Sequence, residues 1–463
     1  MKNMTEGSIT KNILYFSIPM LLGNFFQQFY NIVDSIVVGR FVGKEALGAV
    51  GIAFPVMFLI IALIMGATTG SMILIAQFYG AKKMDALRRM VDTTYIFLFL
   101  MSIIATIAGL LLSPYILQIL KTPDSIYQGA KTYIDIMFIG MLPLFGYNGL
   151  SALMRGVGDS KTPLYLLVIA AILNVFLDIL FVAHFRWGIA GASWATVISQ
   201  GVSFVFGVII LFQKKSILSI RLKMYFDKAL FSKSIAIGIP SGVQQMAVAL
   251  GMMALTRIVN GFGTNAIAAY AAAGRIDAFA MMPAMNFSMA LSTFTGQNIG
   301  ANKIDRVKKG LTSTLFMSTV FCLIITTIIM VFGKNLVSMF NSDPDVISIG
   351  NEYLVIVSAF YVVFSIMFIY NGLLRGVGDT FIPMIITIFS LWAIRIPTSA
   401  ILSGFMGTKG IWFGIPIAWL IGAVFSSIYY YTGRWKTKIA IRNFQTVSIM
   451  NEEAIIEEQE PLI

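Results

Sequence analysis

Long apolar stretches make up most of this chain, and they leave few kinds of fold open to it. A helix needs about 20 mostly apolar residues to cross the hydrocarbon layer of a bilayer. Because the stretches are continuously apolar rather than ten-residue alternations, they predict spanning helices and not the strands of a barrel. The twelve stretches lie near residues 13–39, 46–78, 92–112, 132–154, 163–184, 188–212, 233–259, 266–298, 312–332, 352–374, 382–403 and 410–432.

The composition supports a multi-pass membrane protein. Of the 463 residues, 58% are hydrophobic and only 12% are charged. One water-soluble core cannot bury so much apolar surface, so a soluble enzyme, a fibrous protein and a disordered chain are excluded. The single histidine and single cysteine exclude a metal site or catalytic triad that needs several of them. We expect no cofactor and no enzymatic activity.

The distribution of lysine and arginine predicts the orientation. With the N-terminus in the cytoplasm, 23 of these residues fall on the cytoplasmic side and 7 on the opposite side. This asymmetry places both termini in the cytoplasm of a cell (inner) membrane protein. It also accounts for the net charge of +12 without a nucleic-acid partner.

The two halves of the chain repeat each other at an offset of 220 residues. Residues 153–159 read Leu-Met-Arg-Gly-Val-Gly-Asp, and residues 373–379 read Leu-Leu-Arg-Gly-Val-Gly-Asp. Each half holds six predicted spans, so both halves begin on the same side and form parallel repeats. The expected fold is all-α, with twelve transmembrane helices in two six-helix bundles around a central cleft.

The repeat also predicts the domain organisation. The expected parts are an N-terminal bundle at 1–213, a basic cytoplasmic linker at 214–232, a C-terminal bundle at 233–435 and a disordered cytoplasmic tail at 436–463. Two bundles related by an axis along the membrane normal suit alternating access by rocking. The chain is expected to act as a monomer in contact with membrane lipid.

Polar residues inside spans are the best candidates for function, because they are costly there. Asp34, Asn174, Asp178 and Thr196 are predicted to lie at similar depth in the outer half of the bilayer. At the offset of 220, Asp34 becomes Ala254, Asn174 becomes Ile394 and Asp178 becomes Thr398. The site is therefore expected in the N-terminal bundle. The alternative is that these acids only hydrogen-bond to neighbouring helices.

Three further features allow two interpretations each. Arg257, Arg275 and Asp277 could bind an anionic substrate group or form a structural ion pair, and Arg395 could be satisfied by the backbone or an Asn. Met282 and Met285 share a face with two more methionines and could line a substrate cavity or simply pack. The third feature is Pro19, which permits a kink in the first span and is a candidate hinge.

The twelve spans, the two halves and the repeated Arg-Gly-Val-Gly-Asp together resemble the multidrug and toxin extrusion (MATE) family, over residues 10 to about 435. The resemblance implies an antiporter that exports amphipathic, often cationic organic compounds in exchange for inward H⁺ or Na⁺. It looks most like the DinF-type prokaryotic branch. The family's cation site falls on Asp34, Asn174, Asp178, Ala192 and Thr196, where Na⁺ would be coordinated if the ion is Na⁺. Its inner cavity falls on Gln27, Tyr30, Tyr133 and Asn148.

Other functions remain open on the sequence. A flippase for lipid-linked saccharides shares the broader superfamily's halves, and it would need a more cationic cavity than three arginines in the spans provide. A membrane enzyme would need a reactive constellation, and a sensor would need a signalling domain. The residues do not choose between H⁺ and Na⁺, and they do not name the substrate.

Overall fold

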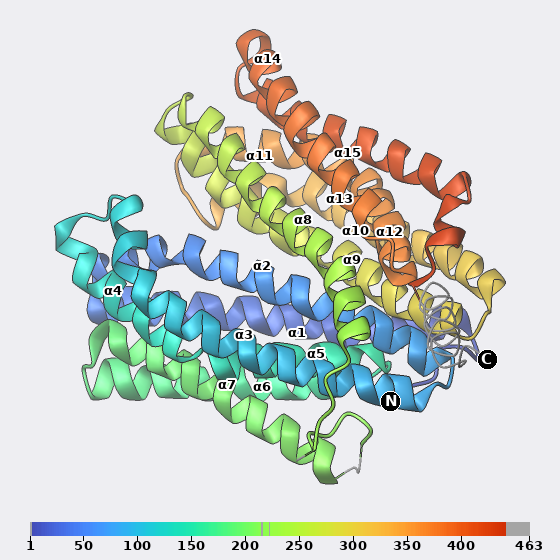
Figure 1. The fold of residues 1–463 in the computed structure, drawn as a ribbon. Coiled ribbons are helices and arrows are strands. Elements are labelled where there is room, and N and C mark those ends of the chain that lie inside the picture. Colours follow the sequence, from blue (N-terminus) through green and yellow to red (C-terminus); the bar gives the residue numbers. More distant parts are fainter. Residues whose placement is uncertain (1, 214–215, 222, 441–463) are drawn as a thin grey trace, which may run out of the picture. The chain divides into compact units, whose positions relative to one another are not determined.

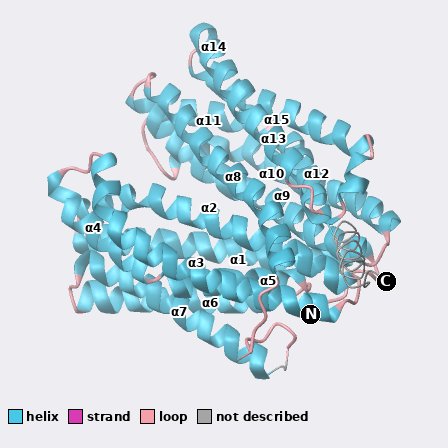
Figure 2. Ribbon diagram, viewed as in Figure 1, coloured by secondary structure: helices cyan, strands magenta, loops and turns pink. Residues whose placement is uncertain are grey.

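The chain folds into helices joined by short loops (Figure 2). The structure is a computed structural model, and it describes residues 2–213, 216–221 and 223–440. The predicted all-α class is confirmed, since no strand occurs in these ranges. Most of the expected C-terminal tail, from residue 441, lies outside the described residues.

The first half of the sequence forms seven α-helices and two short π-helices. They are α1 (Ile9–Val37), η1 (Val38–Val42), α2 (Lys44–Gly80), α3 (Met84–Ile119), α4 (Asp124–Ile139), α5 (Met141–Gly156), α6 (Lys161–Asp178), η2 (Ile179–His184) and α7 (Gly188–Gln213).

The second half follows nearly the same order. Its elements are α8 (Lys228–Asn260), α9 (Thr264–Gly300), α10 (Ile304–Ser338), α11 (Pro344–Ser358), α12 (Tyr361–Val377), α13 (Phe381–Ile388), η3 (Phe389–Arg395), α14 (Ile396–Met406), α15 (Thr408–Tyr431) and η4 (Arg434–Lys438). Figure 1 shows them in yellow-green to red.

Each of the twelve predicted spans falls on one helix or on a run of consecutive helices. Within the described residues, eight helices are long and apolar enough to cross a membrane by themselves, and two bent pairs would each make one more span. The remaining two predicted spans are α1, with 29 residues, and α9, with 37. Both are long enough to cross, but they carry more polar side chains.

The bent pairs have a local cause in the packing. Helices α4 and α5 meet at 53° around Gly140, where a Cβ atom would lie 2.4 Å from the side chain of Val197 in α7. Glycine permits this close approach of α7 at the bend. The equivalent pair, α11 and α12, is bent by 51°.

The structure comprises two compact units whose limits differ from the ends of the repeat. The first holds residues 1–2, 15–75 and 84–242, and the second holds 3–14, 76–83 and 243–463. The helices α1, α2 and α8 therefore each contribute residues to both units. The units are defined by packing, whereas the expected domain ranges were defined by the sequence repeat. The domain ranges therefore remain a prediction.

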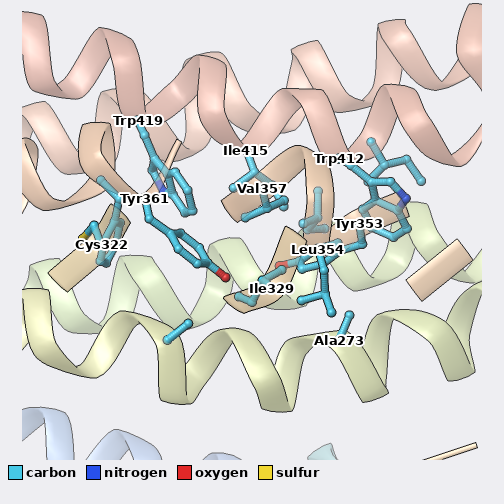
Figure 3. Close-up of a cluster of buried hydrophobic side chains, with 14 of the residues drawn as sticks. Ala273, Cys322, Ile329, Tyr353, Leu354, Val357, Tyr361, Trp412, Ile415 and Trp419 are labelled. Atoms are coloured by element: carbon cyan, nitrogen blue, oxygen red, sulfur yellow. The ribbon is translucent and has the colours of Figure 1, made fainter. Parts of the chain in front are cut away.

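Aromatic and aliphatic side chains fill the core of the second unit. Trp412 stacks on Tyr270 with the ring centroids 5.6 Å apart and meets Tyr353 edge-on at 4.9 Å. Figure 3 shows part of this core, where the rings of Tyr353, Tyr361, Trp412 and Trp419 lie among apolar side chains such as Ile329 and Val357. A second core in the first unit packs α2, α3, α4 and α5 together.

The repeated Arg-Gly-Val-Gly-Asp motifs end helices. In the first copy, Asp159 accepts hydrogen bonds from the backbone N–H groups of Lys161 and Thr162, which begin α6. In the second copy, Gly378 has φ +102° and ends α12 in the left-handed conformation that favours glycine. These contacts support a structural interpretation of the motif.

Candidate functional site

Two acids from different helices, one half-buried and one fully buried, lie close together in the first unit. Asp34 lies near the end of α1, and Asp178 is the last residue of α6. Their carboxyl groups are close enough to interact directly. Asp178 is fully buried, and within the described part of the chain neither of its oxygens accepts a hydrogen bond. The same holds for Oδ1 of Asp34.

An amide and a hydroxyl complete the polar cluster. Asn174 lies one turn before Asp178 on α6, and its Nδ2 donates to Oγ1 of Thr196 in α7 at 3.4 Å. Since the amide nitrogen is engaged there, Oδ1 of Asn174 is left buried without a donor among the described residues. Four oxygens from three residues therefore lack hydrogen-bond donors.

A cluster of this kind is unusual for a protein interior. Buried polar groups are nearly always hydrogen-bonded, so each exception calls for an explanation. Acceptors without donors in the protein can be completed by water, by a proton or by a cation that takes oxygen ligands. The described residues include no group of three or more His, Cys, Asp or Glu side chains placed to hold a metal ion. With only two carboxylates, the cluster suits a monovalent cation or a proton.

Apolar side chains pack beside the cluster. Val37 follows Asp34 by about one turn, Val182 follows Asp178 by one turn, and both pack with Ala192 of α7. The neighbouring Gly191 makes this possible, because a Cβ atom there would lie 3.1 Å from Phe181. Small residues on α7 thus bring three chain segments together next to the acids, and the low-dielectric surroundings strengthen electrostatic interactions.

Both acids lie next to a change of helix type. Residues 38–42 form the π-helix η1 four residues after Asp34, and the π-helix η2 begins directly after Asp178. Single π turns occur often at functional sites, where they disturb the regular backbone ladder. No composition or spacing signal in the sequence marked these turns.

Two of the other predicted cavity residues join the acids, and one is linked to them through a neighbour. Tyr30, one turn before Asp34, and Tyr133 of α4 both interact with the two carboxyl groups. Gln27 is exposed and bonds to Tyr30. Asn148 is different, because its Nδ2 donates to the carbonyl of Leu144 in its own helix at 2.8 Å.

The sequence analysis missed Tyr147, the residue before Asn148. Its side chain interacts with that of Tyr30 and bonds to Ser151 one turn later. A tyrosine in an apolar span was the signal that could have found it. Tyr30 of α1 and Tyr133 of α4 therefore lie near the acids, and Tyr147 of α5 neighbours Tyr30.

The acid of the second half has a different environment. Asp277 of α9 accepts hydrogen bonds from the hydroxyls of Tyr353 at 3.0 Å and Tyr361 at 2.5 Å. The expected ion pair with Arg275 does not form. Arg275 instead lies over the ring of Phe340, 5.8 Å from its centroid. Helix geometry explains this, since residues two apart point to different faces.

Two other polar groups of the second half are held by neighbouring helices. Gln244 donates to Oγ1 of Thr387 in α13 at 2.6 Å. Arg395, at the end of η3, is buried and close enough to interact with Asp277, while its Nε lacks an acceptor among the described residues. The expected backbone or Asn partner for this Nε is therefore not seen.

The remaining predicted residues lie outside the acid cluster. Met282 and Met285 belong to α9 in the second unit, with Met285 45% exposed and the backbone carbonyl of Met282 accepting from Asn286. Pro19 lies buried inside α1, which continues through it as a helix. The cavity role of the methionines and the hinge role of Pro19 remain predictions.

Comparison with known families gives two matches within this chain. The MatE family model matches residues 19–180 and again residues 240–401. The two matched ranges repeat at nearly the offset seen in the sequence, so each half of the chain matches the family separately.

Comparison with curated proteins gives relatives along almost the whole chain. A probable multidrug resistance protein YpnP of Bacillus subtilis (strain 168) is 35% identical over 436 residues, which cover 94% of this chain and 97% of the relative. A probable multidrug resistance protein YoeA of the same organism is 31% identical over 95% of this chain and 97% of its own. A probable multidrug resistance protein NorM of Thermotoga maritima is 25% identical over 94% of each.

Solved structures share the fold. A crystal structure of MATE in the straight conformation superposes with a TM-score of 0.88 at 23% identity, covering 95% of this chain and 99% of the other. An outward-facing MATE family transporter of the MOP superfamily gives the same TM-score of 0.88 at 24% identity, with the same coverage. At this identity the likeness establishes the architecture only.

Proposed function

The chain belongs to the MatE family of multidrug efflux transporters, and from this premise we propose that it is an antiporter that exports amphipathic organic cations in exchange for H⁺ or Na⁺. It is a multi-pass membrane transporter and not an enzyme. We further propose that both termini lie in the cytoplasm, as the lysine and arginine distribution predicts.

The observation that carries the coupling proposal is the set of unpaired oxygens around Asp34 and Asp178. An antiporter needs a site that binds the driving ion and loses it when the substrate binds. Four buried acceptor oxygens without donors provide such a site for a proton or Na⁺. The relatives' names support export of drugs, and negative charge near Tyr30 and Tyr133 suits a cationic aromatic compound.

The repeat comparison supports placing the site in the first half alone. The second half lacks both acids at the equivalent positions, and Asp277 already has two hydroxyl donors. One half would therefore bind the ion, while the other half would complete the alternating pathway.

The test is efflux of a fluorescent cationic dye from proteoliposomes under separately imposed gradients. A Na⁺ gradient at equal pH and a pH gradient without Na⁺ are applied to the same preparation. At least one gradient should drive the dye uphill, and collapsing it with an ionophore should stop export. Dye movement that follows only its own gradient under both conditions would refute antiport.

A further inference from the structure

Two segments, each of which precedes the first helix of one half, form hydrogen bonds with the third helix of the other half. Residues 3–8, called here the N-terminal strap, precede α1 and lie on α9 and α10 in the second unit. Residues 216–221 and 223–227, called here the linker strap, precede α8 and lie on α3 in the first unit. At the offset of 220, α3 and α10 are equivalent helices.

A single arginine holds the N-terminal strap by its backbone. The guanidinium of Arg306 in α10 donates to the carbonyls of Met4 at 3.2 Å, Glu6 at 3.2 Å and Gly7 at 3.1 Å. Asn298 orients it, because Oδ1 of Asn298 accepts from Nε of Arg306 at 3.1 Å.

Side chains at the end of α9 and just before α10 form further hydrogen bonds with the N-terminal strap. Lys303 donates to the carbonyl of Thr5 at 3.0 Å, and Oε1 of Gln297 accepts from the N–H of Met4 at 2.9 Å. Met4 is fully buried and Thr5 is 6% exposed. A polar segment before a membrane helix would ordinarily be solvated, so this amount of specific contact marks a built docking site.

The linker strap is also held by an arginine that donates to backbone carbonyls, and an ion pair adds to these contacts. Arg88 of α3 donates to the carbonyls of Ile217 at 2.6 Å and Ser219 at 2.7 Å. Arg89 pairs with Asp227 at 3.3 Å, and Asp227 in turn caps the start of α8 by accepting from Leu230. The linker strap is therefore held by an ion pair and a helix cap in addition to hydrogen bonds, whereas the contacts of the N-terminal strap given above are all hydrogen bonds.

The N-terminal strap precedes a helix that belongs to both units. Residues 9–14 of α1 belong to the second unit and residues 15–37 to the first, so α1 connects the two. Any movement of one unit against the other must bend α1 or release its beginning. The same helix carries Asp34, so a movement of its first residues involves the helix that contributes to the proposed ion site.

We propose that the N-terminal strap is a latch that Arg306 closes on the second unit and that opens once in every transport cycle. The proposal rests on the proposed antiport, because the cycle supplies the movement. Opening breaks hydrogen bonds but no ion pair, and water can replace these bonds at the partly exposed Arg306. The linker strap, with its ion pair and helix cap, stays closed.

A reversible cross-link tests the latch in the full-length transporter. Cys322, the single cysteine, is first replaced by serine. Oγ1 of Thr10 in α1 lies 2.8 Å from Oγ of Ser313 in α10, so Thr10→Cys with Ser313→Cys places two sulfurs near bonding distance. The matched control joins α10 to α12 inside the second unit by Ser318→Cys with Ser365→Cys, whose hydroxyls are 2.6 Å apart.

The expected result is loss of dye efflux when the latch pair is oxidised, and recovery when it is reduced. The control pair should transport equally in both states. Full cross-linking of the latch pair with undiminished efflux would overturn the latch. If the reduced protein also fails to move dye, the antiport proposal fails instead, and the labelling below then decides about the latch.

Thiol labelling gives an independent readout. Thr5→Cys should react slowly with a membrane-impermeant maleimide at rest and several-fold faster when ion and dye are both supplied. Arg306→Gln should make it react fast at all times, whereas Lys308→Gln, which removes only a surface pair with Asp305, should not. Lys11→Cys, at an exposed position, reports reagent access. Equal, slow labelling of Thr5→Cys in every condition would show a fixed anchor.

Discussion

The two halves of this molecule treat a buried acid in opposite ways. In the first half, Asp178 and Asp34 face each other with three carboxyl oxygens lacking donors. In the second half, Asp277 accepts hydrogen bonds from two tyrosine hydroxyls. The halves descend from one repeat and share one fold, so the difference lies in the local partners.

The hydrogen-bond partners distinguish a candidate ion-binding acid from a structural acid. A carboxylate with two hydroxyl donors is already satisfied and connects α9 with α11 and α12. A pair of carboxylates with oxygens that have no donor among the described residues is where we propose that the coupling ion binds. Burial alone would not distinguish the two cases, whereas the hydrogen-bond partners do.

The largest expected effect comes from removing one acid in each half. Asp34→Asn should abolish ion-driven dye efflux, because the remaining oxygens no longer hold the coupling ion. Asp277→Asn should leave efflux largely intact, because the amide oxygen still accepts from a tyrosine. Efflux is measured in proteoliposomes containing equal amounts of folded protein. Equal losses in both variants would remove the distinction between the halves.

A second expected effect is the dependence of dye affinity on the ions. Two unit charges ~6 Å apart at an effective dielectric constant of ~20 interact by roughly 3 kcal/mol. Neutralising the acids with protons or Na⁺ should therefore weaken binding of a cationic dye by up to about a hundredfold. Affinity should fall as pH falls or as Na⁺ rises, and Asp178→Asn should blunt the trend. Titration in detergent measures this, and a flat wild-type response would leave only indirect coupling.

The free energy of unfolding should fall more when Asp277 is replaced than when Asp34 is replaced, which is the reverse of the order expected for efflux. Asp277→Ala leaves the buried hydroxyls of Tyr353 and Tyr361 without their acceptor, which should cost about 3 kcal/mol in free energy of unfolding. Asp34→Ala removes a charge that has no donor and should change stability by less than about 1 kcal/mol. Unfolding in detergent compares the two variants. A larger loss in Asp34→Ala would indicate that the first-half acids are structural.

The smallest expected effect concerns the helix that carries Asp34. Pro19 removes one backbone hydrogen bond from α1, and Pro19→Ala should restore it and stiffen the helix. Turnover should slow several-fold while dye affinity changes little. Stopped-flow transport and equilibrium binding separate the two quantities. Unchanged turnover would place the flexibility of α1 elsewhere, for instance at the N-terminal strap.

The sequence predicted the helices well because their signals are local and strong. Twelve long apolar stretches and a constant repeat offset leave little freedom, and Asp34 and Asp178 were identified by their cost inside a span. Asn174 and Thr196 followed from depth and helix spacing, and the structure joins their side chains.

What escaped prediction depends on contacts between distant segments. A structural ion pair was one of the two interpretations of Asp277, but the hydroxyls of Tyr353 and Tyr361 reach its carboxylate from α11 and α12. The N-terminal strap looked like an ordinary polar leader to α1. Only the folded chain brings Arg306 to its carbonyls.

The most direct test of the account is whether dye binding displaces the ion from the first-half acids. Purified transporter in weakly buffered detergent solution is mixed with saturating dye, and released protons or Na⁺ are read with an indicator. Linkage predicts release of about one cation per dye by the wild type and by Asp277→Asn. The double variant Asp34→Asn with Asp178→Asn should release none. Undiminished release by the double variant, or no release by the wild type, would contradict an ion site at Asp34 and Asp178.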